Sequence, residues 1–351
     1  MAAPFYATRE MVKLALDSAE TARSNARIDR ALDSATRTIN TLIRRPHGLY
    51  PTVATKVWPW PNQQSARAWR LWLEENTLIS ATTVTSGGVI IPATDYFLEP
   101  VNSGPPYDRL EIDLSSSSAF SAGDTWQRSI EIAGVFGHSN VEAPAGTLAE
   151  ALDASETAVD VTDSAVVGIG DLIRVESERM VVTGKAMLDT GQNLQVSLTA
   201  SLSDVTVAVT NGAAFSVDEI LLIDAERLRI VDIAGNNLVV KRAWDGSVLA
   251  AHTAPTADIY AARTLTVERG ALGTTAATHA TSTAVQRWVP PPLTPQLAIA
   301  EAMVELEAQS SGYAGKRGSG DSERDPAGGT IADLRRQVCH TYRRKILMGA
   351  V

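Results

Sequence analysis

Two internal repeats constrain the fold of this chain more than any other feature of its sequence. The stretch LVVKRAWDGSVLAAH, which starts at Leu238, is matched without a gap by LTVERGALGTTAATH, which starts 27 residues later at Leu265. A second pair aligns at an offset of 48 residues: VDVTDSAVVGIGDLIRVESERMVV from Val159 and VAVTNGAAFSVDEILLIDAERLRI from Val207. Self-similarity of this size usually marks one supersecondary unit that is used twice.

The composition around the repeats indicates that the repeated unit is made of strands. Between residues 139 and 288 the chain is rich in Ala, Thr, Val and Asp, and short β-branched runs recur about every ten residues between turn residues. We therefore predict an all-β region over 139–288 with two related units, at about 147–196 and 197–288.

An arginine, a glycine and a histidine recur at fixed offsets in the 27-residue repeat. The two sets are Arg242, Gly246 and His252, and Arg269, Gly273 and His279. One interpretation is a metal or ligand site at each histidine, but a metal site needs three or four ligands, and neither histidine has another His or Cys nearby. The second interpretation is a structural lock, in which the arginine ends a strand, the glycine makes a tight turn and the histidine hydrogen-bonds the loop. We favour the lock.

Two acidic pairs recur in the 48-residue repeat, Glu176 with Glu178 and Asp224 with Glu226. Alternate residues of a strand face the same side, so each pair could act as an acid–base couple or bind calcium. Each pair is followed directly by an arginine, Arg179 or Arg227. We therefore expect surface or inter-strand ion pairs.

Helical patterns are confined to the two ends of the chain. Apolar residues at i, i+3, i+4 and i+7 predict helix over about 8–44, in one bent or two separate segments that end before Pro46. A second helix is expected after VPPP at 289–292 and a third from Ile331 to Ile346. Residues 49–137 read as short strands bounded by Gly, Pro, Asn or Ser.

Bulk composition excludes several classes of protein. The 351 residues carry a net charge of −9, one cysteine (Cys339) and no run of 18 apolar residues. We expect no disulfide, no membrane span and no tight grip on nucleic acid, and a reducing compartment. Phosphate-loop, nucleophile-elbow and zinc-protease motifs are absent, so we expect no enzyme and no cofactor.

The ends of the chain resemble the head–tail connector (adaptor) proteins of tailed bacteriophages. The resemblance rests on RRP at 44–46, DYFLEP and NSGPPYDRLEI within 95–112, IEIAGVFG at 130–137 and VPP at 289–291. In that family the Gly-x-Phe-Gly strand runs almost directly into Val-Pro; here about 150 residues intervene. LTVERGALGTTAATHATSTAV is itself similar to a β-module of phage virion proteins.

The resemblance implies an α+β fold, a helical-bundle connector scaffold with a few strands. That scaffold would comprise residues 1–138 and 289–351, discontinuous around the inserted β region 139–288. The resemblance further implies a structural virion protein made in the host cytoplasm. It would form a ring, usually of twelve copies, in the neck between the portal and a tail-side neck or stopper protein, with genomic DNA passing through its centre. The family carries no active-site residues.

The basic C-terminus is the candidate docking segment. From Lys316 onward the chain holds eight Lys/Arg and four Asp/Glu, and a loop rich in Gly and Ser precedes the last helix. We expect portal docking by Arg335, Arg336, Val338, Tyr342, Arg343, Arg344 and Lys345. Two other interpretations of this segment are that its cations only complement the helix C-terminus, and that they contact DNA.

For the whole chain, the alternatives are a virion decoration or host-glycan-binding β-module protein, and a hydrolase that uses Glu178 and Glu226.

Overall fold

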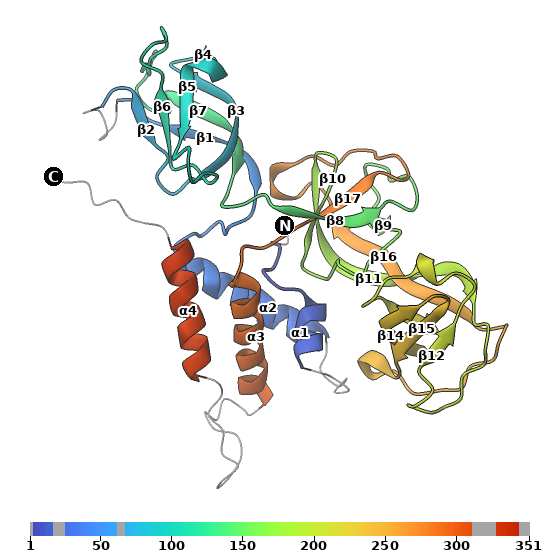
Figure 1. Cartoon of the computed structure of the whole chain (residues 1–351). Coiled ribbons are helices and arrows are strands. Elements are labelled where there is room, and N and C mark those ends of the chain that lie inside the picture. The colour runs from blue at the N-terminus through green and yellow to red at the C-terminus, as the bar shows by residue number, and fades with distance from the viewer. Residues whose placement is uncertain (1–2, 17–24, 62–66, 311–327, 344–351) are drawn as a thin grey trace.

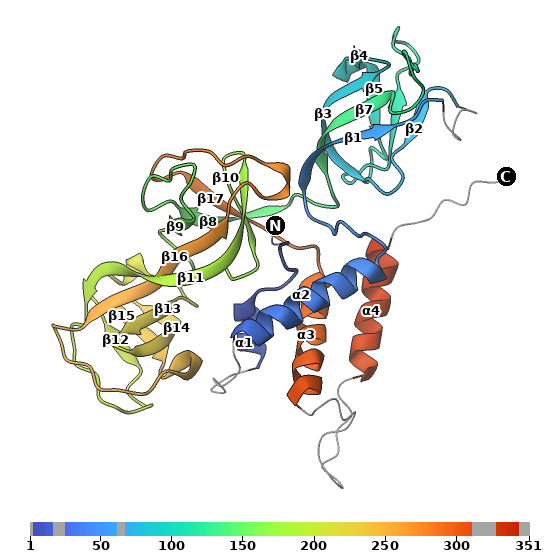
Figure 2. The same cartoon turned by 180° about the vertical axis from the view of Figure 1, so that it is seen from behind.

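The computed structural model describes residues 3–16, 25–61, 67–310 and 328–343 and divides them among three bodies (Figures 1 and 2). Four helices form one body, the strands between residues 52 and 136 a second, and the strands between 142 and 288 a third, elongated one. The expectation of a helical-bundle scaffold with a few strands is wrong, because 36% of the structure is strand and 21% is helical. The physical reason is that the short segments after residue 49 build a complete β domain with its own core.

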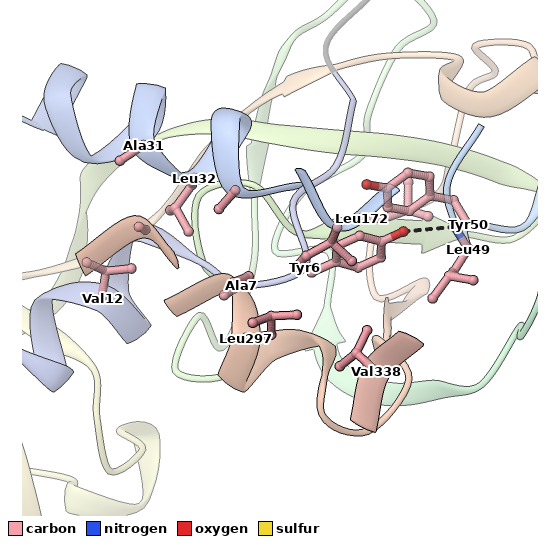
Figure 3. Close-up of a cluster of buried hydrophobic side chains, with 14 of the residues drawn as sticks. Tyr6, Ala7, Val12, Ala31, Leu32, Leu49, Tyr50, Leu172, Leu297 and Val338 are labelled. Atoms are coloured by element: carbon pink, nitrogen blue, oxygen red, sulfur yellow. Dashed lines mark hydrogen bonds between the residues drawn. The ribbon is translucent and has the colours of Figure 1, made fainter. Parts of the chain in front are cut away.

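The helical body joins the two ends of the chain. Its helices are α1 (Arg9–Ala15), α2 (Asn25–Leu42), α3 (Thr294–Ser310) and α4 (Gly328–Tyr342). The expected apolar stripe of α2 faces inward, with Ile28, Leu32 and Ile39 fully buried against α3. Tyr6 lies at the centre of this core, where its hydroxyl donates to Asn40 Oδ1 at 2.7 Å and accepts from the Leu49 amide at 2.9 Å (Figure 3).

The small β domain contains two antiparallel sheets. One has the order β1-β7-β3-β4, from β1 (Thr52–Trp58), β3 (Leu78–Ser86), β4 (Val89–Ile91) and β7 (Ile130–Phe136). The other has the order β2-β6-β5, from β2 (Arg70–Trp72), β5 (Tyr96–Glu99) and β6 (Arg109–Ile112). Its core, which includes Trp58 and Trp60, is separate from that of the helices. Residues 1–138 therefore contribute to two bodies.

The third body is a single ten-stranded antiparallel sheet. Its strands are β8 (Glu142–Thr147), β9 (Ala158–Asp160), β10 (Leu172–Val175), β11 (Glu178–Asn193), β12 (Thr206–Ala208), β13 (Ile220–Ile223), β14 (Glu226–Ala234), β15 (Asn237–Lys241), β16 (Asp258–Glu268) and β17 (Ala284–Trp288). The long strands β11 and β16 pair with each other from Val181–Glu268 to Asn193–Asp258 and run through the whole body (Figure 1).

The two repeat units are nested, one inside the other. One apolar core draws on residues 145–182 and 265–285, and the other lies wholly within 194–261. We name residues 142–186 plus 264–288 the outer module and residues 187–263 the inner module. This differs from consecutive units at 147–196 and 197–288, because the outer module takes its last two strands from chain that follows the inner module.

The outer module is joined to the helical body by a shared core. Leu172, Val181, Ala271 and Trp288 pack in the same apolar cluster as α2 and α3. An insertion requires its two ends to be neighbours, and here the Val289 amide donates to the Val141 carbonyl at 2.8 Å. The inner module has no side chain in that cluster.

The 3-10 turn η4 (Ala271–Gly273) connects the outer module to the small β domain. A Cβ on Gly273 would lie 2.0 Å from the carbonyl oxygen of Val53 in β1, at a φ of +80°. We expect Gly273→Ala to lower the free energy of unfolding by about 1–3 kcal/mol more than Gly191→Ala. Gly191 is the control because its φ is +66° and nothing lies within 4 Å of its Cβ position. Equal urea midpoints for the two variants would show that the contact is not tight.

Candidate functional site

The feature of this chain with the most chemistry is a buried carboxylate, which recurs in each module. In the inner module Glu226, fully buried at the start of β14, accepts two hydrogen bonds from Arg242, at 2.7 Å from Nε and 2.8 Å from Nη2. The backbone amides of Ala243 and Ala250 donate to the same carboxylate at 2.9 and 3.1 Å. The remaining Arg242 donors bind the carbonyls of Thr199, Asp204 and Ala250. The ion pair therefore ties the start of β14 to two loops, residues 194–205 and 242–257.

A histidine completes the inner cluster. Nε2 of His252 lies 2.9 Å from Glu226 Oε2, and its Nδ1 lies 2.6 Å from Asp224 Oδ2. The histidine side chain is fully buried, whereas that of Asp224 is 62% exposed. Carboxylates only accept hydrogen bonds, so both contacts are satisfied when both ring nitrogens carry protons. His252 also forms a β-bridge with Leu198.

The outer module repeats the cluster contact by contact. Glu178 accepts from Arg269 Nε and Nη2 at 2.6 and 2.7 Å and from the amides of Gly270 and Ala277. His279 bridges Glu178 and Glu176 at 2.9 and 2.8 Å. The remaining Arg269 donors bind carbonyls of the loop at 153–156 and of Ala277.

The backbone of the turn is repeated as closely as the side chains. Gly246 and Gly273 end matching 3-10 turns at φ of +75° and +80°. The preceding left-handed residues also correspond, Asp245 at +50° and Leu272 at +51°. All six residues named from the 27-residue repeat therefore lie in the two clusters or their turns.

The expected ion pairs do form and join different segments, but they are buried rather than on the surface, and their arginines are not the ones that directly follow the acidic pairs. Glu178 and Glu226 are buried, and their partners are Arg269 and Arg242, not Arg179 and Arg227. Because alternate strand residues share a face, the arginine directly after each glutamate points to the opposite side of the sheet. A signal for this grouping is present in the sequence: the acidic pair of the 48-residue repeat and the Arg–Gly–His set of the 27-residue repeat each occur twice, once for each unit.

The geometry of the clusters is that of a structural device. Both carboxylate oxygens of Glu226 and of Glu178 accept hydrogen bonds from protein donors. Neither carboxylate therefore has an oxygen left to bind a substrate or an ion. Across the described residues no group of three or more His, Cys, Asp or Glu could hold a metal ion. Of the four aromatic residues in 139–288, all of which are described, Phe215, Trp244 and Trp288 are buried and Tyr260 is partly buried, so the region offers little stacking surface to a glycan.

Both carboxylates titrate well below their ordinary range. Burial alone would raise the pKa of Glu226, but the hydrogen bonds from Arg242, Ala243, His252 and Ala250 outweigh it and lower the pKa to about 2. Glu178 behaves in the same way, with a pKa of about 2. A folded-state pKa below the ordinary 4.5 means that each cluster contributes stability above that pH and loses it as the pH falls from 4.5 through 2.

The low pKa predicts acid sensitivity that depends on Glu226. Between pH 4.5 and 2 the urea midpoint of the wild type should fall more steeply than that of Glu226→Gln, which has no carboxylate to protonate at this position. The measurement is a series of urea titrations at fixed pH. Parallel curves for the two proteins would mean that Glu226 is not ionised in the fold.

The histidines offer a smaller test of the same device. We expect His252→Ala to lower the free energy of unfolding by about 1–3 kcal/mol, because a buried hydrogen bond to a charged group is lost. Addition of a chelator to the wild type should leave the melting temperature unchanged. A clear drop on chelation would mean that a metal ion, and not the carboxylates, holds His252 and His279.

The predicted docking residues of the C-terminus divide into three groups. Val338 and Tyr342 are buried in the helical core and cannot contact a partner, so that part of the expectation is wrong. Arg335, Arg336 and Arg343 are all exposed; Arg335 pairs with Glu301 at 2.5 Å and Arg336 with Asp333 at 3.2 Å. Arg344 and Lys345 lie outside the described residues. A shallow groove of about 650 Å³ runs along α4 beside the three described arginines.

Comparisons add no relative to these observations. No protein-family model, no curated protein and no solved structure matches the chain. In the described residues no helix is long and apolar enough to cross a membrane.

Proposed function

We propose that this chain is a structural virion protein of a tailed bacteriophage, a head-to-tail adaptor that forms a ring between the portal and the tail. The proposal rests on the similarity of its end segments to that family. In this proposal the helical body and the small β domain have the adaptor role, and the two modules extend from them.

One observation carries this proposal: three of the adaptor-like segments, RRP, the end of IEIAGVFG and VPP, are far apart in sequence but meet at one junction. Arg45 of RRP donates to the Tyr342 carbonyl at 3.2 Å, and the Tyr342 hydroxyl donates to the carbonyl of Pro292 at 2.6 Å, next to VPP. His138, directly after IEIAGVFG, donates from its amide to the Leu49 carbonyl at 3.2 Å and stacks edge-on against Tyr342. Segments that are separated by an insertion but belong to one scaffold should meet in this way.

The charge distribution fits the proposed place in a neck. A net charge of −9 repels DNA, so a lumen lined by such a chain would let DNA pass without holding it. The exposed arginines Arg335 and Arg336 of α4, and Arg343 directly after it, are the groups that would contact an acidic surface of the portal.

The proposal is tested by assembly. Sedimentation velocity and electron microscopy of the purified chain, alone and with portal-bearing heads, should show a ring and its attachment at the portal vertex. High salt should weaken that attachment, because exposed charges are screened. A protein that stays monomeric and never attaches to heads would contradict the proposal.

A charge reversal tests the docking face more cleanly than truncation, since removal of α4 would open the helical core. Arg336→Glu should reduce attachment to heads. Arg37→Glu is the matched control: both arginine side chains are 78% exposed, and each pairs with an aspartate on its own helix. Equal attachment of the two variants would rule out α4 as the docking face.

A further inference from the structure

The outer module has a face that binds an extended segment of this chain. The Phe5 amide donates to the Gly170 carbonyl at 2.8 Å, and the Arg9 amide donates to the Ile169 carbonyl at 3.2 Å. In the opposite direction the Ile169 amide donates to Glu10 Oε2 at 2.8 Å. The loop 168–170 thus binds a peptide through two carbonyls and one amide, and the amide takes a carboxylate.

The inner module carries the same loop at an offset of 48 residues, as residues 216–218. The Asp218 amide donates to the Ile230 carbonyl at 3.0 Å, as the Gly170 amide does to Val182 at 2.8 Å. The Ser216 amide donates to Glu219 at 3.1 Å, as the Gly168 amide does to Asp171 at 2.8 Å. Asp218 and Gly170 both have positive φ, +76° and +101°. The binding loop is therefore preserved in its backbone geometry.

In the inner module this loop is open. Val217, the equivalent of Ile169, is 45% exposed, and its amide and carbonyl have no hydrogen-bond partner among the described residues. A half-buried loop that keeps the geometry of a peptide-binding loop but lacks the peptide indicates a vacant binding face.

The surface beside the loop is apolar in the outer module and cationic in the inner module. Where the outer module has Val181 and Ala271, packed in the helical core, the inner module has Arg229 and Trp244. The Arg229 guanidinium and the Lys241 ammonium lie 5.2 and 5.3 Å from the centre of the Trp244 ring. This face is therefore not a second copy of the contact with the helices.

A groove of about 420 Å³ lies between this face, α1 and the loop at 164–169. Its lining holds six cationic residues (Arg9, Lys13, Lys185, Arg227, Arg229 and Arg287) and four anionic ones (Glu10, Asp218, Glu219 and Asp245). Most of these charges are paired: Arg229 with Asp218, Lys13 and Arg227 with Asp245, and Arg9 with Asp29 outside the lining. The volume is in the usual range for a ligand site, and the carboxylate that the outer module binds, Glu10, indicates the chemistry of the occupant.

We propose that the inner module binds an extended peptide segment of a partner protein along the loop 216–218 and the groove that Asp218 lines beside it, and that the segment carries an acidic side chain. The carboxylate accepts a hydrogen bond from the Val217 amide, as Glu10 does from Ile169, and peptide amides donate to the carbonyls of Val217 and Asp218. Arg229 adds charge attraction beside Trp244. The proposal is independent of the adaptor function, because it rests on the comparison of the two modules.

The test uses the full chain and acetylated, amidated octapeptide libraries in which one central position is fixed as Glu, Gln or Lys. Fluorescence polarisation should show at least tenfold tighter binding of the Glu library than of the Lys library. Val217→Asp should weaken binding at least tenfold through repulsion. Val231→Asp is the matched control, since Val231 is 50% exposed in the same module and lies on β14, not on the loop 216–218. Arg229→Val, which introduces the outer module's residue, should abolish the preference for Glu.

Amide hydrogen exchange supplies the second measurement. In the free protein the Val217 amide should exchange faster than the Ile169 amide, and the Glu library should slow exchange at Val217. Equal binding of the Glu and Lys libraries, or binding that Val217→Asp leaves unchanged, would overturn the proposal. Protection of Val217 in the free protein would also overturn it, because the chain itself would then cover the face.

Discussion

Replacement of Glu226 by alanine is expected to lower the free energy of unfolding of the inner module by about 3–5 kcal/mol, the cost of breaking a buried ion pair by removing one partner. Arg242 and His252, both fully buried in their side chains, would lose the carboxylate that neutralises them. The Ala243 and Ala250 amides would lose their acceptor as well. A loss of this size is a large share of the stability of a domain.

The loss should be confined to one module, since the inner core is separate from the other three. In urea, Glu226→Ala should unfold in two steps, with the inner module first and the remainder near the wild-type midpoint. Asp232→Ala is the control, because Asp232 lies on the same strand β14 but is exposed, and we expect a change within about 0.5 kcal/mol. Comparable losses in both variants would mean that the cluster does not hold the module together.

A double variant separates the ion pair from simple loss of packing. Glu226→Ala with Arg242→Met removes both charges and should recover part of the stability lost in the single variant, because no uncompensated charge remains buried. If the two losses simply added, the contact between Glu226 and Arg242 would carry no coupling energy.

The helices could be predicted from sequence because their signal is local. The stripe through Ile28, Leu32 and Ile39 lies within one segment, and the packing that buries it follows from the period of the helix.

The nesting of the modules could not be predicted in this way. It depends on the pairing of β11 with β16, which brings Val181 opposite Glu268 across 87 residues of chain. The two sequence offsets identify both copies of the unit, but they predict copies that follow each other along the chain. A pattern of repeats gives the order of similar segments along the chain, whereas the strand register decides which segments share a core.

The clusters were predicted in part for a related reason. His252 and His279 were recognised because each recurs with its arginine at a fixed offset, but the glutamates belong to the other repeat. Only the fold brings Glu226 to Arg242 across 16 residues and Glu178 to Arg269 across 91. The separation is longer in the outer module because the inner module lies in the chain between Glu178 and Arg269.

Because the inner module is nested within the outer one and has its own core, deletion of the inner module should leave a folded protein. Ala186 and Thr264 face each other across β11 and β16, so a two-residue Asn-Gly turn can replace residues 187–263. No residue of the outer core is removed. The glycine takes the place of Arg263, whose carbonyl accepts from the Val161 amide, and it still offers a carbonyl there.

Deletion of the whole region 139–288 should have the opposite result, although it too joins two neighbouring points of the chain. It removes Leu172, Val181, Ala271 and Trp288 from the core of the helical body. Loss of buried side chains of this kind costs about 2–5 kcal/mol for each large residue, so the sum reaches the whole stability of a typical domain. Circular dichroism and thermal unfolding of the two deletion proteins compare them directly. A cooperative transition in the shorter deletion and none in the longer would follow from the shared core, whereas two equally stable proteins would mean that the helical body does not depend on the outer module.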